Sequence, residues 1–308
     1  MSYLVVGSGS IGRRHHANIS ALGGQCTLVG WRDFDRKSVE LSSLTGIVIA
    51  TATQVRLPLI ALAAEAGVPL YIEKPIAVSP DDLERVLEAT EAIGSRSVAG
   101  LMMRYHPVIR YLSGLESEIL GFQFEIGHDV RQWRLNWRFA DSYAAQPDGG
   151  GVLLDLCHEI DMAACLIDGL SVTTVDCLGH EFFPGIDFLS RVGLAGRGVI
   201  GSVAMDYLSP KTTRRLSMFG YEVAVDVDLL SCEVREWRSG KTATKTWQFD
   251  RNDMFLGLMR DFMALAEGRE PSDNPLLPRL DCVGAAARLV SSAWEKRTFR
   301  THLSGDFE

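Results

Sequence analysis

The sequence GSGSIG at residues Gly7–Gly12 directly follows the apolar run YLVV at Tyr3–Val6. A buried strand that enters such a turn and leaves it as a helix is typical of a dinucleotide-binding domain. The first glycine permits the turn, the second, Gly9, lets a pyrophosphate approach the backbone, and the third lets the helix pack on the strand. The N–H groups of Ser10 and Ile11 would face the phosphates. The turn therefore predicts a Rossmann domain that binds NAD or NADP.

Two different patterns of secondary structure divide the chain. Over residues 1–100, short apolar strands alternate with helices, which predicts a parallel sheet. Only about 14 residues separate Asp33 from the strand at 47–50, too few for a helix and another strand. We therefore expect a trimmed Rossmann domain, short of one helix and one edge strand. Residues 101–308 carry many β-rich runs and then two helices, which predicts a second, α+β domain with a mostly antiparallel sheet.

Composition excludes several classes of partner. The sequence has 31 Lys and Arg against 39 Asp and Glu, a formal net charge of −8, which disfavours nucleic acid and anionic membrane surfaces. It contains no run of about 18 apolar residues that could span a bilayer. Its six cysteines show no C-x-x-C spacing, and no signal-peptide pattern precedes the glycine turn. We expect a cytoplasmic protein with reduced cysteines.

The choice between NAD and NADP depends on residues that follow the second strand. An acid about 20 residues after the glycine turn can accept hydrogen bonds from the ribose hydroxyls. Asp33 lies at this distance, which favours NAD. Arg32 and Arg36 flank it and suit a 2′-phosphate, which favours NADP. The sequence leaves both cofactors open, and a simple loop acid at Asp33 is a further interpretation.

A second motif, Glu73-Lys74-Pro75, follows the apolar strand at Leu70–Ile72. Ligands of open α/β sheets bind at the carboxyl ends of the strands, so Lys74 would reach a bound nicotinamide. Burial and the positive charge of the oxidised ring favour the neutral amine, which can accept a proton. The spacing alone fits a surface lysine in a turn equally well.

A third motif, GGGVLLDLCHEID at Gly149–Asp161, opens a predicted helix over 151–167. Asp155 and His158, three residues apart, share the polar stripe of this helix. A buried histidine and acid are costly unless they pair with each other or meet a ligand. The motif therefore indicates either a site that contacts a ligand or a structural pair. A metal site is not expected, because no further ligands occur at useful spacing.

The loop before this helix contains Trp133, Arg134 and Tyr143. Indole faces and guanidinium groups suit the apolar face and hydroxyls of a sugar, or a carboxylate or phosphate. These side chains are candidate substrate-binding groups, although aromatic packing that anchors the loop explains them equally well.

Taken in order, these motifs resemble the glucose–fructose oxidoreductase/inositol dehydrogenase family (Gfo/Idh/MocA) over nearly the whole chain. The similarity also includes GRRH after the glycine turn, IAT at 49–51, RYHP at 104–107 and NDMF at 252–255. The resemblance implies a Rossmann domain, a second domain with a large open sheet often used for oligomer contacts, and hydride transfer between NAD(P) and a carbohydrate-like alcohol. Lys74 matches the family's catalytic lysine, His158 its proton-relaying histidine, and Asp155 the neighbouring acid.

The resemblance also places Thr51 and Glu73 at the cofactor, and Arg104 and Tyr105 at the substrate. Three departures from the family pattern stand out. The acid lies three residues before the histidine rather than four, which leaves the role of Asp155 open. Alanine replaces the usual proline at position 52, and arginine replaces the usual histidine at position 56.

These observations predict an NAD(P)-dependent oxidoreductase that acts on a secondary alcohol or ketone of a sugar, polyol or sugar nucleotide. The alternatives are a non-catalytic NAD(P)-binding regulator or scaffold of the same fold, and a reductase of a non-sugar substrate. We also expect a homo-oligomer, a dimer or tetramer, formed through the C-terminal sheet. Helices are expected to cover one face of that sheet and to leave the other face partly apolar, through Val199, Val203, Met205, Leu216 and Met218.

Overall fold

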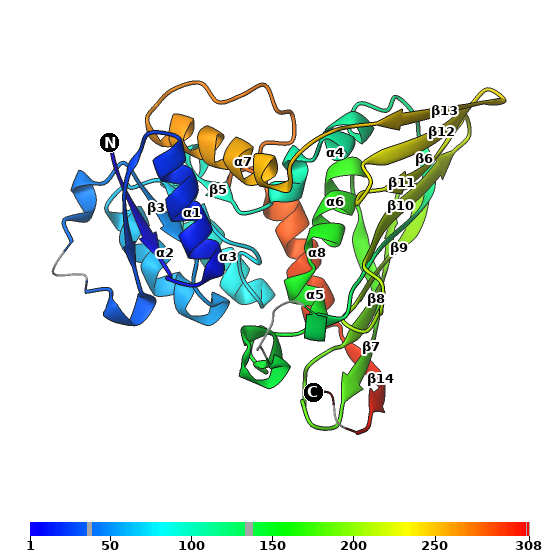
Figure 1. Ribbon diagram of the computed structural model, residues 1–308, viewed down its shortest axis with the longest axis horizontal. Coiled ribbons are helices and arrows are strands. Elements are labelled where there is room, and N and C mark those ends of the chain that lie inside the picture. The colour runs from blue at the N-terminus through cyan, green and yellow to red at the C-terminus, as the bar shows by residue number, and fades with distance from the viewer. Residues whose placement is uncertain (36–38, 133–137, 306, 308) are drawn as a thin grey trace. The chain divides into compact units, whose positions relative to one another are not determined.

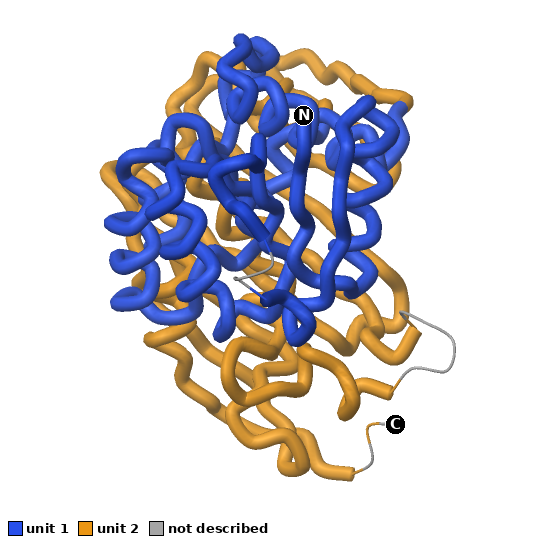
Figure 2. Tube along the Cα trace, turned by 90° about the vertical axis from the view of Figure 1, so that its left-hand side faces the viewer, with its two compact units in different colours: residues 1–106, 249–288 blue, residues 107–248, 289–308 orange. Residues whose placement is uncertain are grey.

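The computed structural model describes residues 1–35, 39–132, 138–305 and 307. It divides into two compact units, coloured separately in Figure 2. Unit 1 is formed by residues 1–106 and 249–288, and unit 2 by residues 107–248 and 289–308. A late segment of the chain thus joins the unit that holds the N-terminal sheet. The domain boundary between residues 100 and 101 stays a prediction.

Unit 1 contains a five-stranded parallel sheet in the order β2-β1-β3-β4-β5 (Figure 1). Its strands are β1 (Ser2–Val6), β2 (Gln25–Val29), β3 (Gly46–Ile49), β4 (Leu70–Ile72) and β5 (Val98–Ala99). A full dinucleotide-binding sheet has six strands, with the third at the edge beside the second. Here β2 is the edge strand, and no strand is described between it and β3. The trimmed Rossmann domain is therefore confirmed.

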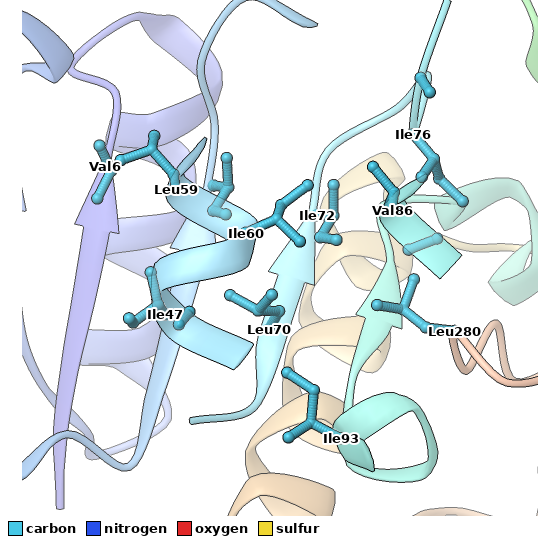
Figure 3. Close-up of a cluster of buried hydrophobic side chains, with 14 of the residues drawn as sticks. Val6, Ile47, Leu59, Ile60, Leu70, Ile72, Ile76, Val86, Ile93 and Leu280 are labelled. Atoms are coloured by element: carbon cyan, nitrogen blue, oxygen red, sulfur yellow. The ribbon is translucent and has the colours of Figure 1, made fainter. Parts of the chain in front are cut away.

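Helices cover both faces of this sheet. They are α1 (Ser10–Ala21), α2 (Arg56–Glu65), α3 (Pro80–Ala89) and, from the late segment, α7 (Arg251–Ala266). Ile60 of α2 and Val86 of α3 pack with Ile47 and Ile72 of the sheet in one apolar core (Figure 3). Each such side chain, once fully buried, contributes about 1.5–3 kcal/mol.

The opposite face of the five-stranded sheet packs against α7. The ring of Phe262 on α7 lies 5.8 Å from that of Tyr71 and 6.2 Å from that of Tyr3. Tyr71 alternates with Ile72, so neighbouring residues of one strand serve opposite faces, as strand geometry requires. This packing explains why residues 249–288 belong to unit 1.

Unit 2 contains a nine-stranded mixed sheet in the order β13-β12-β11-β10-β6-β9-β8-β7-β14 (Figure 1). Its strands are β6 (Ile119–Gly127), β7 (Ser171–His180), β8 (Leu189–Gly196), β9 (Val199–Asp206), β10 (Thr213–Gly220), β11 (Val223–Asp228), β12 (Glu233–Arg238), β13 (Lys241–Thr246) and β14 (Thr298–Leu303). Among the strand pairs that the structure describes in this sheet, β6–β9 and β7–β14 are parallel and the others are antiparallel. The large, mostly antiparallel sheet is therefore confirmed, while the edge strand β14 was not predicted.

The single helix predicted over 151–167 is wrong, because the chain forms two helices there. Helix α5 (Val152–Asp155) ends where Leu156 leaves the helical region, and α6 (His158–Leu166) begins two residues later. Asp155 and His158 therefore belong to different helices and do not share one continuous stripe. Helices α4 (Pro107–Leu112), α5 and α6 lie along one face of the nine-stranded sheet (Figure 1). Helix α8 (Gly284–Glu295) contributes residues to both units.

The five residues expected on the uncovered face of this sheet lie on the opposite, buried face. Val199, Val203, Met205, Leu216 and Met218 are each at most 8% exposed. Strand register explains the error, because Leu216 and Val203 both pair with the buried Phe124. Alternation within a strand predicts that its residues serve two faces, but it does not say which face the helices cover.

Among the described residues, no helix is both long enough and apolar enough to cross a membrane.

Candidate functional site

Two glycines of the turn at Gly7–Gly12 are required by packing within the protein itself. Gly7 has a φ of +120°, and a Cβ added there would lie 2.3 Å from the carbonyl oxygen of Ala50. A Cβ on Gly12 would lie 1.7 Å from the carbonyl oxygen of Gly7. A side chain at Gly7 would collide with the backbone that follows β3, and one at Gly12 would push α1 away from the turn after β1. The first glycine is thus required by the turn and the third by helix packing, as predicted.

Gly9 differs from its neighbours because nothing around it requires a glycine. A Cβ added at Gly9 meets no atom of the described residues within 4 Å, and the φ of Gly9 is an ordinary −69°. Gly9 is the N-cap of α1 and has no side chain with which to cap that helix end. An open position at the donor-lined N-terminus of a helix is what a phosphate group fits. The turn therefore has room and donors for the pyrophosphate of a dinucleotide.

The carboxylate of Asp33 lies close to this turn. A Cβ built on Gly30, just after β2, would lie 2.5 Å from Asp33 Oδ2 and 3.5 Å from Ser8 Oγ. Asp33 and Arg32 are both exposed. Their position at the carboxyl end of β2 is where the ribose of a dinucleotide binds in this type of sheet. Arg36, the other candidate for a 2′-phosphate, lies outside the described residues.

Glu73 follows β4 and forms a buried hydrogen bond, because the Nε2 atom of His15 on α1 lies 2.7 Å from its Oε1. Burial by itself would raise the pKa of Glu73. The hydrogen bond and charge of His15, with the charges of Lys74 and Arg56, outweigh burial and lower the pKa below its usual value. Glu73 is therefore held as a carboxylate beside Lys74, which is half-buried.

Arg56, which begins α2, joins the chain segments that follow β3 and β4. Its Nη2 and Nε atoms donate to the carbonyl oxygen of Thr51, at 2.7 and 3.2 Å. Its Nη1 atom donates to the carbonyl oxygens of Glu73 and Pro75, and Nη2 lies 3.5 Å from that of Lys74. The Lys74–Pro75 peptide bond is cis. The candidate catalytic lysine thus lies in a backbone segment held by a buried guanidinium.

In unit 2, Asp155 is buried and accepts hydrogen bonds from two tyrosine hydroxyls. Tyr207, just after β9, donates to Asp155 Oδ2 at 3.2 Å, and the exposed Tyr143 donates to Oδ1. Burial, and then the nearby charge of Asp155, raises the pKa of Tyr207 well above its usual value. The hydroxyl of Tyr207 therefore stays protonated and donates a hydrogen bond to Asp155. Tyr143, a predicted substrate-binding residue, contacts Asp155 directly.

His158 and Glu159, at the start of α6, are buried beside further charged groups. Glu159 Oε1 accepts a hydrogen bond from Arg214 Nε on β10 at 2.6 Å. Burial lowers the pKa of His128, at the end of β6, although the charge of Asp155 opposes this effect. The residues around α5 and α6 therefore combine acids, histidines and an arginine within unit 2.

The remaining predicted site residues have other surroundings. Tyr105 donates its hydroxyl to Asp261 Oδ2 on α7 at 2.5 Å, and the buried Arg104 lies in the same short helical turn. Their roles at the substrate stay predictions. Trp133 and Arg134 lie outside the described residues. Among the residues that the structure describes, no group of three or more His, Cys, Asp or Glu side chains forms a metal site.

Sequence reasoning missed several residues of these clusters. His15 belongs to the GRRH string, and Arg56 departs from the family pattern. Both residues were therefore visible in the sequence, but no contact was predicted for either. No local pattern pointed to Tyr207 or Arg214, because each lies more than 50 residues from its hydrogen-bond partner in the sequence. Such contacts follow from strand register and not from local pattern.

Known proteins resemble this chain in sequence over part of its length and in fold over nearly all of it. No family model matches. The inositol 2-dehydrogenase of Paracoccus denitrificans (strain Pd 1222) is 25% identical over 186 residues, 53% of this chain and 53% of that protein. The chain spans about half or less of the curated relatives it matches.

Two solved structures match most of the fold. UDP-N-acetylglucosamine 3-dehydrogenase GnnA from Acidithiobacillus ferrooxidans has a TM-score of 0.76 and 18% identity, and covers 96% of each chain. Levoglucosan dehydrogenase, in complex with NADH and levoglucosan, has a TM-score of 0.77 and 18% identity, over 96% of this chain and 98% of that one. These matches confirm the predicted fold.

Gly9 and Gly12, at the start of α1, should respond differently to replacement by alanine. Helix propensity alone would make Gly12→Ala stabilising by up to about 1 kcal/mol. Because the added Cβ would overlap the Gly7 carbonyl, we expect instead a loss of about 1–3 kcal/mol in the free energy of unfolding. Gly9→Ala, with open space around it, should change stability by less than about 1 kcal/mol. Urea unfolding measures both, and a more stable Gly12→Ala variant would contradict this account.

The depressed pKa of Glu73 predicts a particular dependence of stability on pH. A carboxyl whose folded-state pKa lies below the ordinary value of 4.5 stabilises the fold above that value, and this contribution disappears as the pH falls. Glu73→Gln should therefore lower the free energy of unfolding by about 1–3 kcal/mol at pH 7. The gap between the variant and the original protein should narrow below pH 4.5, as urea unfolding across pH would show. A gap of constant size would argue against a charged Glu73.

Proposed function

We propose that this chain, which resembles the Gfo/Idh/MocA family in sequence and in fold, is an NAD(P)-dependent dehydrogenase or reductase. Its substrate is a secondary alcohol or ketone of a sugar, polyol or sugar nucleotide. The observation that carries the proposal is the open position at Gly9, at the N-terminus of α1 and close to the carboxylate of Asp33. Dehydrogenases of inositol, levoglucosan and UDP-N-acetylglucosamine among the similar proteins support the substrate class.

The residues of unit 1 fit a dinucleotide. The backbone N–H groups of Ser10, Ile11 and Gly12 suit the pyrophosphate, and Asp33 suits the ribose hydroxyls. The nicotinamide, when bound, accepts or returns the hydride of the reaction. The choice of cofactor stays open, because Arg32 is exposed beside Asp33 and suits a 2′-phosphate.

Lys74 and His158 hold and move the proton of the substrate hydroxyl in this proposal. A positioned lysine amine or imidazole can accept a hydroxyl proton during oxidation and return it during reduction. Asp155 is already paired with two tyrosine hydroxyls, so its proposed role is to tune the site rather than to carry the proton. Both Lys74 and His158 are present, which favours an enzyme over a non-catalytic regulator. We place the protein in the cytoplasm, where its thiols would stay reduced.

Substitution of the two proton-carrying residues tests the proposal. Lys74→Met and His158→Ala should each lower turnover by about 10²–10⁴-fold, because proton transfer by a positioned side chain raises the rate by about that factor. Their affinity for dinucleotide should stay within a few-fold, and Asp155→Asn should lose less activity. Turnover is followed by nicotinamide absorbance with sugars, polyols and nucleotide sugars, and affinity by calorimetry with NAD(H) and NADP(H).

Lys211→Met, at an exposed lysine of unit 2, is the matched control and should behave as the original protein. Failure of the unmodified protein to bind any of the four dinucleotides would reject the cofactor assignment. Dinucleotide binding without turnover of any substrate would favour the regulator. Normal turnover per folded molecule in His158→Ala, with a lowered melting temperature, would make that histidine structural.

We also propose that the nine-stranded sheet forms a homo-oligomer, through a different set of residues from those first expected. One row of paired residues crosses the uncovered face, with Gly121 between Ile200 and Phe219, and Ala224 between Phe219 and Trp237. Ile200 is 70% exposed, Phe219 53% and Trp237 37%. An exposed apolar row on a broad sheet is typical of a surface that another protein covers.

Ile200→Asp should convert an oligomer into monomers, because burying an unpaired charge opposes association. Light scattering at micromolar concentration measures the mass. Leu230→Asp, at an exposed leucine in the turn between β11 and β12, is the control and should leave the oligomer intact. A monomeric mass for the unmodified protein would refute the proposal.

A further inference from the structure

We propose that Arg56 is a positioning residue for Lys74: it fixes the backbone that carries the lysine against the end of the neighbouring strand. This role rests on the proposed function, in which Lys74 moves a proton. Arg56 is 4% exposed and lies at the first position of α2. No role follows for it from the family resemblance, where a histidine is usual at this position.

The guanidinium of Arg56 binds backbone carbonyls in two segments at once, one that follows β3 and one that follows β4. Thr51 follows β3 and accepts two hydrogen bonds, while the carbonyls of residues 73–75, after β4, converge on the Nη atoms. The regular ladder between these strands ends at the pair Ile49 and Ile72, and its last bond runs from Glu73 N to Ile49 O at 3.0 Å. Arg56 therefore continues the connection between the two segments beyond the last ladder bond.

A second contact holds the same segment from another side. Glu73 Oε1 lies 2.7 Å from Nε2 of His15, and Glu73 Oε2 accepts the backbone N–H of Lys74 at 3.1 Å. The carbonyls of residues 73–75 are thus bound by Arg56, and the amide of Lys74 is bound through Glu73. With both sides of the peptide fixed, the position of the Lys74 Cα is set by α1 and α2.

Arginine suits this position better than the residues it could be exchanged for. Its planar group offers five N–H donors and stays charged at every physiological pH. A histidine has two ring nitrogens and so reaches at most two carbonyls. A lysine keeps the charge but concentrates it at one atom, so it cannot span Thr51 and Pro75 in the same way.

The contact has a consequence for the reaction because Thr51 is a proposed cofactor-binding residue. One side chain fixes both the strand end assigned to the cofactor and the strand end that carries the lysine. Catalysis by a positioned group is sensitive to errors of about 1 Å, which can cost about 10²-fold in rate. Arg56 therefore affects the rate of turnover through geometry, without touching the substrate.

Hydrogen exchange measured by mass spectrometry on the full-length protein tests the role without relying on activity. In Arg56→Lys, peptides covering residues 70–78 should exchange about tenfold faster or more, because the remaining ammonium cannot replace the lost carbonyl contacts. Peptides covering β1 and α1 should exchange at the original rate. Turnover should fall by about 10²-fold, with the Kd for dinucleotide within a few-fold.

Arg96→Lys is the matched control, since exposed Arg96 donates to the carbonyl oxygen of Gly67 at 3.1 Å in the same unit. It should leave exchange of residues 70–78 unchanged. Unaltered exchange of these residues in Arg56→Lys, or faster exchange throughout unit 1, would overturn the positioning role. If Arg56→Lys does not fold, Arg56→His is measured in the same way, with the same criteria.

The two proposals fail in different ways. An original protein that binds no dinucleotide would reject the proposed function, even if exchange at residues 70–78 responds to Arg56→Lys. If the original protein binds dinucleotide and turns over substrate, and Arg56→Lys keeps full activity despite faster local exchange, only the positioning role is rejected.

Discussion

The parallel pairing of β1 with its neighbours is the constraint on which unit 1 depends. Parallel strands end at the same edge of a sheet, and the connections that follow those ends are therefore brought together. The glycine turn follows β1, Asp33 follows β2, Thr51 follows β3 and Lys74 follows β4. Residues spread over almost 70 positions of the sequence thus lie at one edge of the sheet, although no local pattern links them.

Burial of charge is the second constraint, and both units meet it in the same way. A charge removed from water must be paired or hydrogen-bonded, or the fold loses several kcal/mol. Glu73 is offset by His15 and by the nearby cations, and Arg56 by backbone carbonyls. In unit 2, Asp155 is hydrogen-bonded by two tyrosines. Each arrangement keeps polar groups inside the protein, close to positions where chemistry is proposed.

Local pattern predicted the parts of the fold that depend on neighbours in sequence. The strand at Leu70–Ile72, the glycine turn and the trimmed edge all follow from apolar runs and their spacing. The break between α5 and α6 did not, because residues 152–160 contain no proline or glycine that would mark the end of a helix. Strand β14 was missed because its alternating polar residues suit an edge and resemble a loop. The covered face of the large sheet is set by helix packing, which no single strand encodes.

The same distinction applies to the candidate sites. Gly7 and Gly12 are explained by atoms of the protein that would overlap a side chain, so their presence says only that strand and helix pack closely. Gly9 has no such neighbour among the described residues, and in the proposed function the pyrophosphate of the cofactor explains why this position lacks a side chain. Arg56 is the opposite case, since its internal contacts account for it fully and make it a support for the residue beside it. Contacts within the protein therefore distinguish residues that support the site from residues that are proposed to contact a ligand, even where both belong to one motif.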